Sequence, residues 1–166
     1  MINHQGSHIL FRLKSVELTS ELIQGTFPNY TNIIPKSYNT KATVNLSELM
    51  KAIRIASIFS AGDKIIRLEI MPKKSICKTR NESCSSKITI SARNDKFGDN
   101  RGEVNASVKG KAAKIAFNSK YLLDVLGVLT EEEVALETTD TSSPGVIRQV
   151  GRDNYIHVIM PMFVQW

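Results

Sequence analysis

Near the amino terminus, hydrophobic and polar residues alternate with a period of two, which is typical of β-strands. The alternation covers residues 9–13 and 16–23, and a connector rich in turn-forming residues follows over 24–35. Two strands alone are only marginally stable in water. The pattern therefore predicts that these strands complete a sheet whose other strands lie outside this sequence.

From residue 42 onward, one pattern of elements occurs twice. The first copy predicts a short strand, a helix and three strands, at 42–44, 46–59, 65–71, 87–93 and 103–109. The second predicts the same five elements at 113–117, 119–129, 134–138, 145–150 and 155–160. Two such units most economically merge their sheets. We therefore expect an α+β fold, a duplicated βαβββ domain with two helices on one face of the sheet.

Both helices have start signals and an apolar stripe. Asn45, followed by Glu48, forms an entry like a capping box, and Asn118 can cap the second helix. A helical period places the apolar residues of each helix on one side, facing the predicted sheet. These residues are Leu46, Leu49, Met50, Ile53, Leu122, Val125, Leu126 and Leu129.

The outward faces of the helices carry candidate contact residues. Basic side chains there either contact phosphates or form an ordinary solvated face, and the two interpretations stay open for Lys51, Arg54 and Lys120. The far end of the first helix is apolar and therefore unfavourable in water. It predicts contact with a protein partner through Ile55, Ile58 and Phe59.

The sequence finishes in an unusually apolar run. Pro161 has no amide N–H and suits the edge or the end of a sheet, with flexible Met160 and Met162 beside it. This arrangement is typical of a peptide-binding groove. From these residues alone, packing of the tail on its own core is an equally good interpretation.

Composition limits the possible classes of protein. The 166 residues, 42% of them hydrophobic, suffice for one well-packed core, and 22 Lys and Arg against 16 Asp and Glu give a net charge of +6. The positive charge favours a polyanionic partner. No apolar run approaches the roughly 20 residues that cross a bilayer, and no signal-peptide pattern opens the sequence. We expect a cytoplasmic protein with no membrane partner.

Catalytic and metal-binding motifs are missing from the sequence. None of His4, His8 and His157 stands in a motif with a nucleophile or a metal ligand, and no phosphate-binding loop is present. The spacing of Cys77 and Cys84 matches no zinc pattern, so free thiols are favoured over a metal site. The sequence therefore favours a binding protein over an enzyme, without metal or other cofactor.

Four motifs carry a resemblance to a known family. They are Gly-Thr-Phe-Pro-Asn-Tyr-Thr-Asn-Ile-Ile-Pro at 25–35, Phe-Asn-Ser-Lys-Tyr-Leu-Leu-Asp-Val-Leu at 117–126, Ser-Ser-Pro-Gly-Val-Ile at 142–147 and Val-Ile-Met-Pro-Met at 158–162. In this order they resemble the bacterial replicative sliding clamp, the beta subunit of DNA polymerase III. The resemblance implies that 1–35 is the remnant of a central clamp domain with its interdomain connector, and that 36–166 is the carboxy-terminal clamp domain.

The resemblance implies a non-catalytic processivity scaffold for DNA replication. In the family, two three-domain chains close into a homodimer ring that encircles duplex DNA. Such a ring holds DNA polymerase III, clamp loader subunits and repair polymerases through short peptides. DNA contacts must be weak and independent of sequence, and they would fall on Lys51, Arg54 and Lys120. Ring closure would use the end of the first helix and an adjacent edge strand, at Ile55, Ile58, Phe59 and Glu103.

The family's second site is a hydrophobic pocket for a partner's extended peptide. Transferred by motif, its wall here comes from the connector, the second helix, a turn and the last strand. The residues are Pro28, Asn32, Ile33, Asn118, Tyr121, Ser142, Pro144, Val158, Ile159, Met160, Pro161 and Met162.

The sequence departs from the family in three places. Residues 72–86 replace a tight hairpin, and 163–166 replace a short basic ending, which puts the mouth of the pocket in doubt. The first domain and most of the second have no counterpart, so a ring requires that these domains be supplied. A stand-alone peptide-binding module, or a truncated clamp fragment that forms no ring, remains the alternative.

Overall fold

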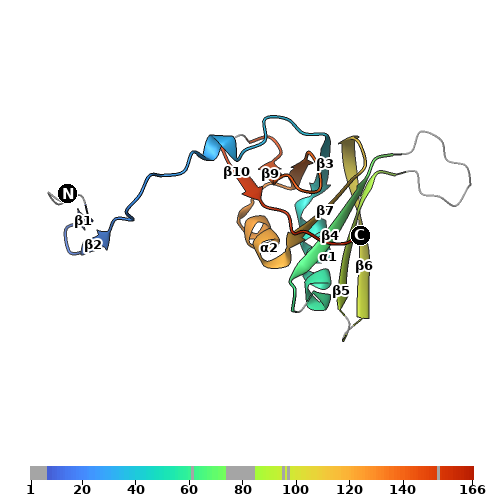
Figure 1. The fold of residues 1–166 in the computed structure, drawn as a ribbon, viewed down its shortest axis with the longest axis horizontal. Coiled ribbons are helices and arrows are strands. Elements are labelled where there is room, and N and C mark those ends of the chain that lie inside the picture. Colours follow the sequence, from blue (N-terminus) through green and yellow to red (C-terminus); the bar gives the residue numbers. More distant parts are fainter. Residues whose placement is uncertain (1–6, 61, 74–84, 95, 97, 153) are drawn as a thin grey trace, which may run out of the picture. The chain divides into compact units, whose positions relative to one another are not determined.

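The computed structural model describes residues 7–60, 62–73, 85–94, 96, 98–152 and 154–166. It divides into two compact units, Met1–Tyr30 and Thr31–Trp166. Figure 1 shows both units, and a single turn of 3₁₀-helix, Tyr30–Asn32, spans the point of division. The predicted 72–86 insertion, with Cys77 and Cys84, lies mostly outside the described residues, as does His4.

The first unit contains a β-hairpin, as the alternating pattern predicted. Strand β1 (His8–Arg12) pairs antiparallel with β2 (Glu17–Glu21), so that Phe11 stands opposite Leu18. Both of these apolar side chains are more than half exposed, and every residue of β2 is exposed. The hairpin therefore buries no core of its own within the described residues. That it completes the sheet of a preceding domain stays a prediction.

The second unit contains the predicted duplication. Its first copy consists of β3 (Thr40–Asn45), α1 (Leu46–Phe59), β4 (Ile65–Met71), β5 (Lys87–Asn94) and β6 (Gly98–Gly110). The second consists of β7 (Ala113–Asn118), α2 (Ser119–Val128), β8 (Glu133–Thr138), β9 (Gly145–Gln149) and β10 (Ile156–Ile159). The order β-α-β-β-β, repeated once, is confirmed.

The strands of both copies join in one antiparallel sheet. Its order is β10-β9-β8-β3-β6-β5-β4-β7, eight strands among the described residues. The long strand β6 connects the halves, because residues 98–105 pair with β5 whereas 106–110 pair with β3. The helices α1 and α2 contact each other and pack on the curled sheet, as Figure 1 shows. The expected α+β architecture is confirmed.

Hydrogen bonding at the sheet differs between the two copies. In the first copy, β3 and β6 pair along five residues of each strand, Thr40–Val44 against 106–110. The equivalent strands of the second copy, β7 and β10, stand at opposite ends of the strand order. Within the described residues, one backbone hydrogen bond connects β7 to the segment after β10, from Met162 N–H to the Ala116 carbonyl at 2.8 Å. The sheet is thus open between β7 and β10.

Side-chain caps start both helices as predicted. The Asn45 carboxamide oxygen accepts from the backbone N–H groups of Ser47 at 3.0 Å and Glu48 at 3.2 Å. Asn118 accepts from the N–H of Lys120 at 3.0 Å. Because the first N–H groups of a helix have no partner within the helix, these bonds fix where each helix begins.

The hydrophobic core lies between the two helices and the sheet. The predicted stripe of α2 is buried in full, and in α1 Leu49 and Ile53 are buried whereas Leu46 and Met50 are partly buried against the core. Phe117, at the end of β7, is among the largest fully buried side chains. Its ring fills the space over the backbone of Gly145, the first residue of β9.

The contact between Phe117 and Gly145 can be tested by adding one methyl group. A Cβ at Gly145 would overlap the Phe117 ring, so Gly145→Ala should lower the free energy of unfolding by about 1–3 kcal/mol. Gly127→Ala is the matched control, because Gly127 lies exposed in α2 with open space around it. The control should raise stability by up to about 1 kcal/mol in urea unfolding. Equal stability of Gly145→Ala and the parent would contradict this packing.

Candidate functional site

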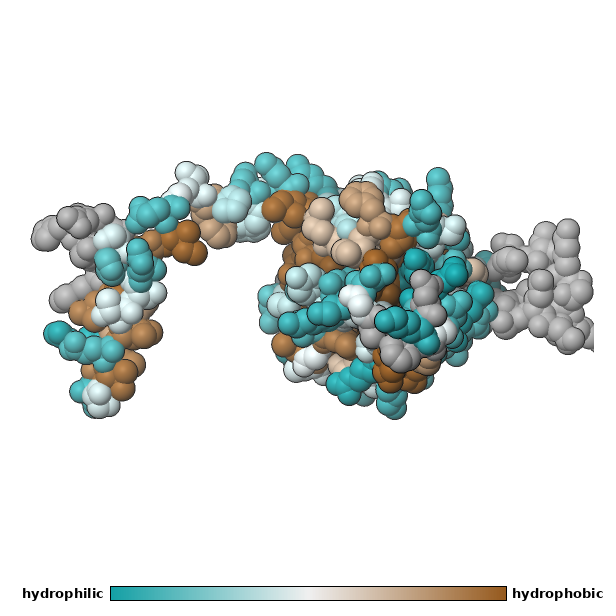
Figure 2. Space-filling model, turned by 60° about the horizontal axis from the view of Figure 1, so that its bottom comes forward, coloured by the Kyte–Doolittle hydropathy of each residue, from teal (hydrophilic) through white to brown (hydrophobic). Residues whose placement is uncertain are grey.

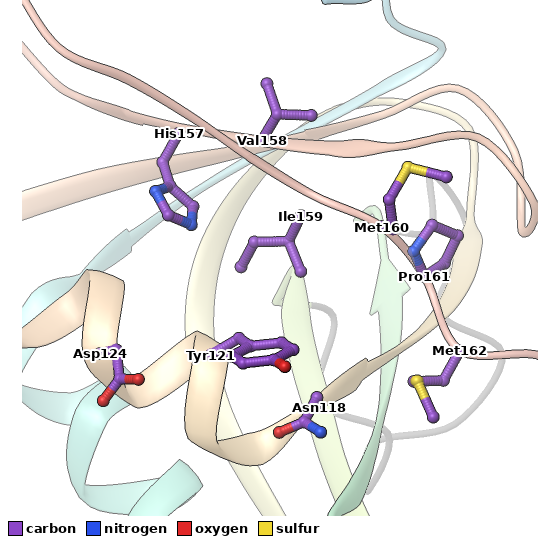
Figure 3. A pocket seen from close by; sticks show the side chains of 9 residues that line it. All are labelled: Asn118, Tyr121, Asp124, His157, Val158, Ile159, Met160, Pro161 and Met162. Carbon is purple, nitrogen blue, oxygen red and sulfur yellow. The ribbon is translucent and has the colours of Figure 1, made fainter. Parts of the chain in front are cut away.

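A cavity of about 500 Å³ lies in the second unit, where β7 and β10 separate. One side of it comes from the end of β7 and from α2, and the other comes from β10 and the segment that follows. Figure 3 shows the nine lining residues, Asn118, Tyr121, Asp124, His157, Val158, Ile159, Met160, Pro161 and Met162.

The residues that line the cavity from α2 and its N-cap are spaced three apart in the sequence. Asn118 caps α2, and Tyr121 and Asp124 follow at intervals of three, which places all three on neighbouring turns of one face. The Tyr121 side chain is 60% exposed, although it is large and mostly apolar. In Figure 3 its ring lies across the cavity from Ile159. An aromatic ring left open to solvent at a cavity is available to an apolar ligand.

The other side of the cavity is formed by β10 and by the residues that follow its last paired residue, Ile159. Ile159 is buried at the end of β10, and Met160 and Met162 on either side of Pro161 are 63% and 36% exposed. The pairing of β10 with β9 ends at Ile159, and Pro161, two residues later, has no N–H with which to resume it. Met162 then donates its N–H to Ala116. The two thioether side chains are therefore carried by a segment that leaves β10 and reaches β7.

The two ends of the cavity differ in polarity. Asp124 and His157 lie toward one end in Figure 3, whereas Met160, Pro161 and Met162 lie toward the other. The Tyr155 hydroxyl is 3.1 Å from Nδ1 of His157. Burial lowers the pKa of His157 below its usual 6.5, so the imidazole is neutral at pH 7. A ligand thus meets one carboxylate, one neutral imidazole and a longer apolar wall.

The structure brings together part of the predicted pocket. Asn118, Tyr121 and the whole run 158–162 line the cavity. Asn32 and Ile33, in the second unit, do not, and Pro28 belongs to the first unit. The role of these residues in peptide binding stays a prediction.

Ser142 and Pro144 lie outside the cavity as well, in the turn between β8 and β9. This turn is held by Asp140, whose carboxylate accepts hydrogen bonds from the hydroxyl and the N–H of Ser142, each at 2.8 Å. These bonds, with a similar pair from Ser143, lower the pKa of Asp140 to about 2. The turn is therefore kept in shape by an ionised side chain at neutral pH.

Asp124 and His157 line the cavity although the sequence did not single them out. The position of each residue in the sequence could have indicated this. Asp124 follows Tyr121 by three residues on the same helical face, and His157 comes directly before the predicted run 158–162. Neither residue belongs to the set of pocket residues that the family resemblance supplied, so both were left out of the prediction.

The predicted DNA-facing residues all reach solvent. Lys51 and Arg54 are exposed on α1 and Lys120 is exposed on α2. No ion pair to another side chain of the described residues holds any of the three. Because the two helices contact each other on one face of the sheet, these cations share that side of the unit.

The predicted subunit-interface residues fall into two groups. Ile55 and Ile58 are 53% and 68% exposed, whereas Phe59 is only partly exposed and packs against the core. Ile55 and Glu103 line one hollow of about 540 Å³ between α1 and β6. Residues 98–105 of β6 pair with β5 on one side, and no described strand pairs with their other side. An open strand edge thus lies next to the exposed isoleucines.

Apolar side chains also reach the surface elsewhere. Figure 2 shows brown, hydrophobic patches on both units among mainly hydrophilic residues.

Among the described residues, no cluster of three or more His, Cys, Asp or Glu side chains could hold a metal ion. No helix in the described part of the chain is long and apolar enough to span a membrane.

Comparison with known proteins identifies relatives of this fold. Residues 31–163 match the family described as "DNA polymerase III beta subunit, C-terminal domain". The beta sliding clamp of Staphylococcus epidermidis is 30% identical over 160 residues, which are 95% of this chain and 39% of that protein. The sliding clamp from Bacillus subtilis has a TM-score of 0.81 at 26% identity, over 96% of this chain and 40% of that one.

A sliding clamp from Pseudomonas aeruginosa bound to griselimycin gives the same TM-score, 0.81, at 27% identity, over 95% of this chain and 40% of that one. This chain spans about 39% of the length of the curated relatives that it matches. The family match at 31–163 includes both helices, all strands of the large sheet and every residue that lines the cavity. The chain therefore belongs to the family of the carboxy-terminal domain of the DNA polymerase III beta subunit, the replicative sliding clamp.

Proposed function

We propose that this chain is the peptide-binding part of a sliding clamp, a non-catalytic scaffold that tethers DNA polymerase III, clamp loader and repair proteins to duplex DNA. The observation that carries this proposal is the cavity between α2 and the carboxy-terminal segment. This chain spans about 39% of its clamp relatives, so a ring would also require the other clamp domains.

The chemistry of the cavity suits a short apolar peptide. Its volume of about 500 Å³ lies within the range typical of ligand sites, and most of its wall is apolar. Methionine side chains are flexible, so Met160 and Met162 can repack around leucine or phenylalanine anchors of several partners. The Tyr121 ring on α2 faces this wall, and Ile159, which is buried at the end of β10, fixes the start of the wall in the core. A related clamp that holds griselimycin supports ligand binding by this fold.

The helical face suits weak contact with DNA phosphates. Lys51, Arg54 and Lys120 are exposed cations on neighbouring helices of a chain with a net charge of +6. Long, solvated cations attract phosphates without reading base sequence. Contacts of this kind allow a closed ring to stay on duplex DNA and still slide.

Ring closure is assigned to the open edge of β6 and the end of α1. Ile55 and Ile58 supply exposed apolar surface, Glu103 supplies charge, and residues 98–105 supply unpaired backbone groups. Such an edge pairs readily with a strand of another chain. The mate would be a first clamp domain, and residues 1–35 would end the central domain.

A second candidate function is a stand-alone module that binds clamp partners without encircling DNA. The cavity favours this candidate too, because every residue that lines it belongs to the second unit. The two functions share the cavity and differ in their need for the remaining domains.

The cavity assignment predicts which substitutions weaken binding of a peptide of the Gln-x-x-Leu-Phe type. Met160→Ala and Tyr121→Ala each remove a large side chain from the wall, so each should weaken binding by about 2 kcal/mol, roughly 30-fold. Lys51→Ala on α1 should have no effect, nor should Val128→Ala, which truncates a 63% exposed apolar residue of α2 outside the cavity. Calorimetric titration measures all four, and equal losses would refute the assignment.

The ring proposal predicts topological retention on DNA. When the chain is co-expressed with a polypeptide that supplies the missing clamp domains, a ring-sized dimer should stay on circular DNA and leave linearised DNA. Alone, the chain should bind duplex DNA at about 10⁻⁴ M or weaker, with a shallow dependence on salt. Absence of retention would favour the stand-alone module. Tight, sequence-selective binding in a gel shift would contradict both.

A further inference from the structure

The last residues of the chain run along β7 after they leave the cavity. Met162 donates its N–H to the Ala116 carbonyl at 2.8 Å. Four residues later, the ring of Trp166 lies over Lys114, with Nζ 5.3 Å from the ring centroid. Lys114 precedes Ala116 by two residues on β7, so the segment advances along this strand in the antiparallel direction. We call residues 163–166 the strap.

The strap lies beside an edge of the sheet. β7 is the last strand in the order and pairs with β4 on its inner side. An uncovered edge leaves backbone N–H and C=O groups without partners. The Met162 bond satisfies one of these groups. Phe163 at the start of the strap is 86% exposed, whereas Trp166 at its end is 48% exposed. The terminal ring therefore makes closer contact with the sheet than Phe163 does.

An ion pair with Glu69 positions the Lys114 ammonium group next to the Trp166 ring. The Lys114 Nζ forms an ion pair with Oε1 of Glu69 at 3.0 Å, and Glu69 stands opposite Lys114 in the register of β4 and β7. Trp166 also borders a hollow of about 370 Å³, whose other residues come from the starts of β3 and β7, the residues just before them and the turn after β8. The ring thus rests on a positioned cation at the border of an open hollow.

We propose that Trp166 is a positioning residue for the cavity: by docking on Lys114 it holds the strap along β7 and so fixes the wall formed by Met160, Pro161 and Met162. Trp166 itself does not line the cavity. Its effect passes through the chain to Met162, whose N–H bond to Ala116 is the next fixed point. A wall that is already in place spares an incoming peptide the loss of conformational entropy. This inference rests on the proposed peptide-binding function.

Amide hydrogen exchange tests the strap without any peptide. In the full chain, Trp166→Ala and Lys114→Met should each raise the exchange rate of the Met162 amide by about two- to five-fold, the factor that an exposed cation–π contact provides. Lys114→Arg keeps the cation and should leave the rate near that of the parent. Phe163→Ala is the matched control, since it removes an exposed aromatic side chain from the same tail and should leave the exchange rate unchanged.

Calorimetry with the Gln-x-x-Leu-Phe peptide then tests positioning. Trp166→Ala and Lys114→Met should weaken binding by about two- to five-fold, and Lys114→Arg should retain the affinity.

Two outcomes overturn the inference while the proposed function stands. One is an unchanged Met162 exchange rate in Trp166→Ala, and the other is raised exchange with unchanged peptide affinity. If the parent chain and all variants fail to bind the peptide, the proposed function fails and the positioning role fails with it. Exchange is measured without peptide, so it reports on the strap even when no peptide binds. Raised Met162 exchange in Trp166→Ala, together with no binding by the parent, would mean that the proposed function is wrong although the strap contact exists.

Discussion

The cavity of this domain exists because β7 and β10 do not pair with each other. In the first βαβββ copy the equivalent strands, β3 and β6, pair along five residues of each. In the second copy, within the described residues, one backbone bond joins β7 to Met162 in the segment after β10. Pro161 contributes to this difference because it has no N–H to continue a ladder. Where pairing stops, side chains of α2 and of the carboxy-terminal segment border a cavity instead of a closed sheet. One half of the duplicated fold thus pairs its first and last strands, and the other leaves a cavity between them.

The core explains how the domain tolerates this opening. Both helices contact each other and bury their apolar stripes on the sheet, and Phe117 at the end of β7 is fully buried next to the N-cap of α2. The helical wall of the cavity therefore starts from a fixed point. The opposite wall has Ile159 in the core but leaves Met160 63% exposed. A firm wall facing an adaptable one suits several partner peptides better than two firm walls would.

Periodicity predicted the elements well because apolar spacing reflects burial. The helix at 46–59 has the predicted bounds, but β6 begins at Gly98 and not near Glu103. Residues 98–102 show no apolar alternation, and their pairing with β5 is made by the backbone, which leaves little trace in the sequence. Side-chain position was harder to predict. Phe59 packs on the core at the end of α1, and His157 joins the cavity only because β10 lies opposite α2.

The central claim is that the opening between β7 and β10 is where a partner peptide binds. Nuclear magnetic resonance mapping of backbone amides during titration with a Gln-x-x-Leu-Phe peptide tests it most directly. The account predicts saturable shifts that are largest at 118–124 and 157–162, apart from Pro161, which has no amide proton. Shifts that are largest along 98–105 of β6, or no saturable shift at all, would contradict it.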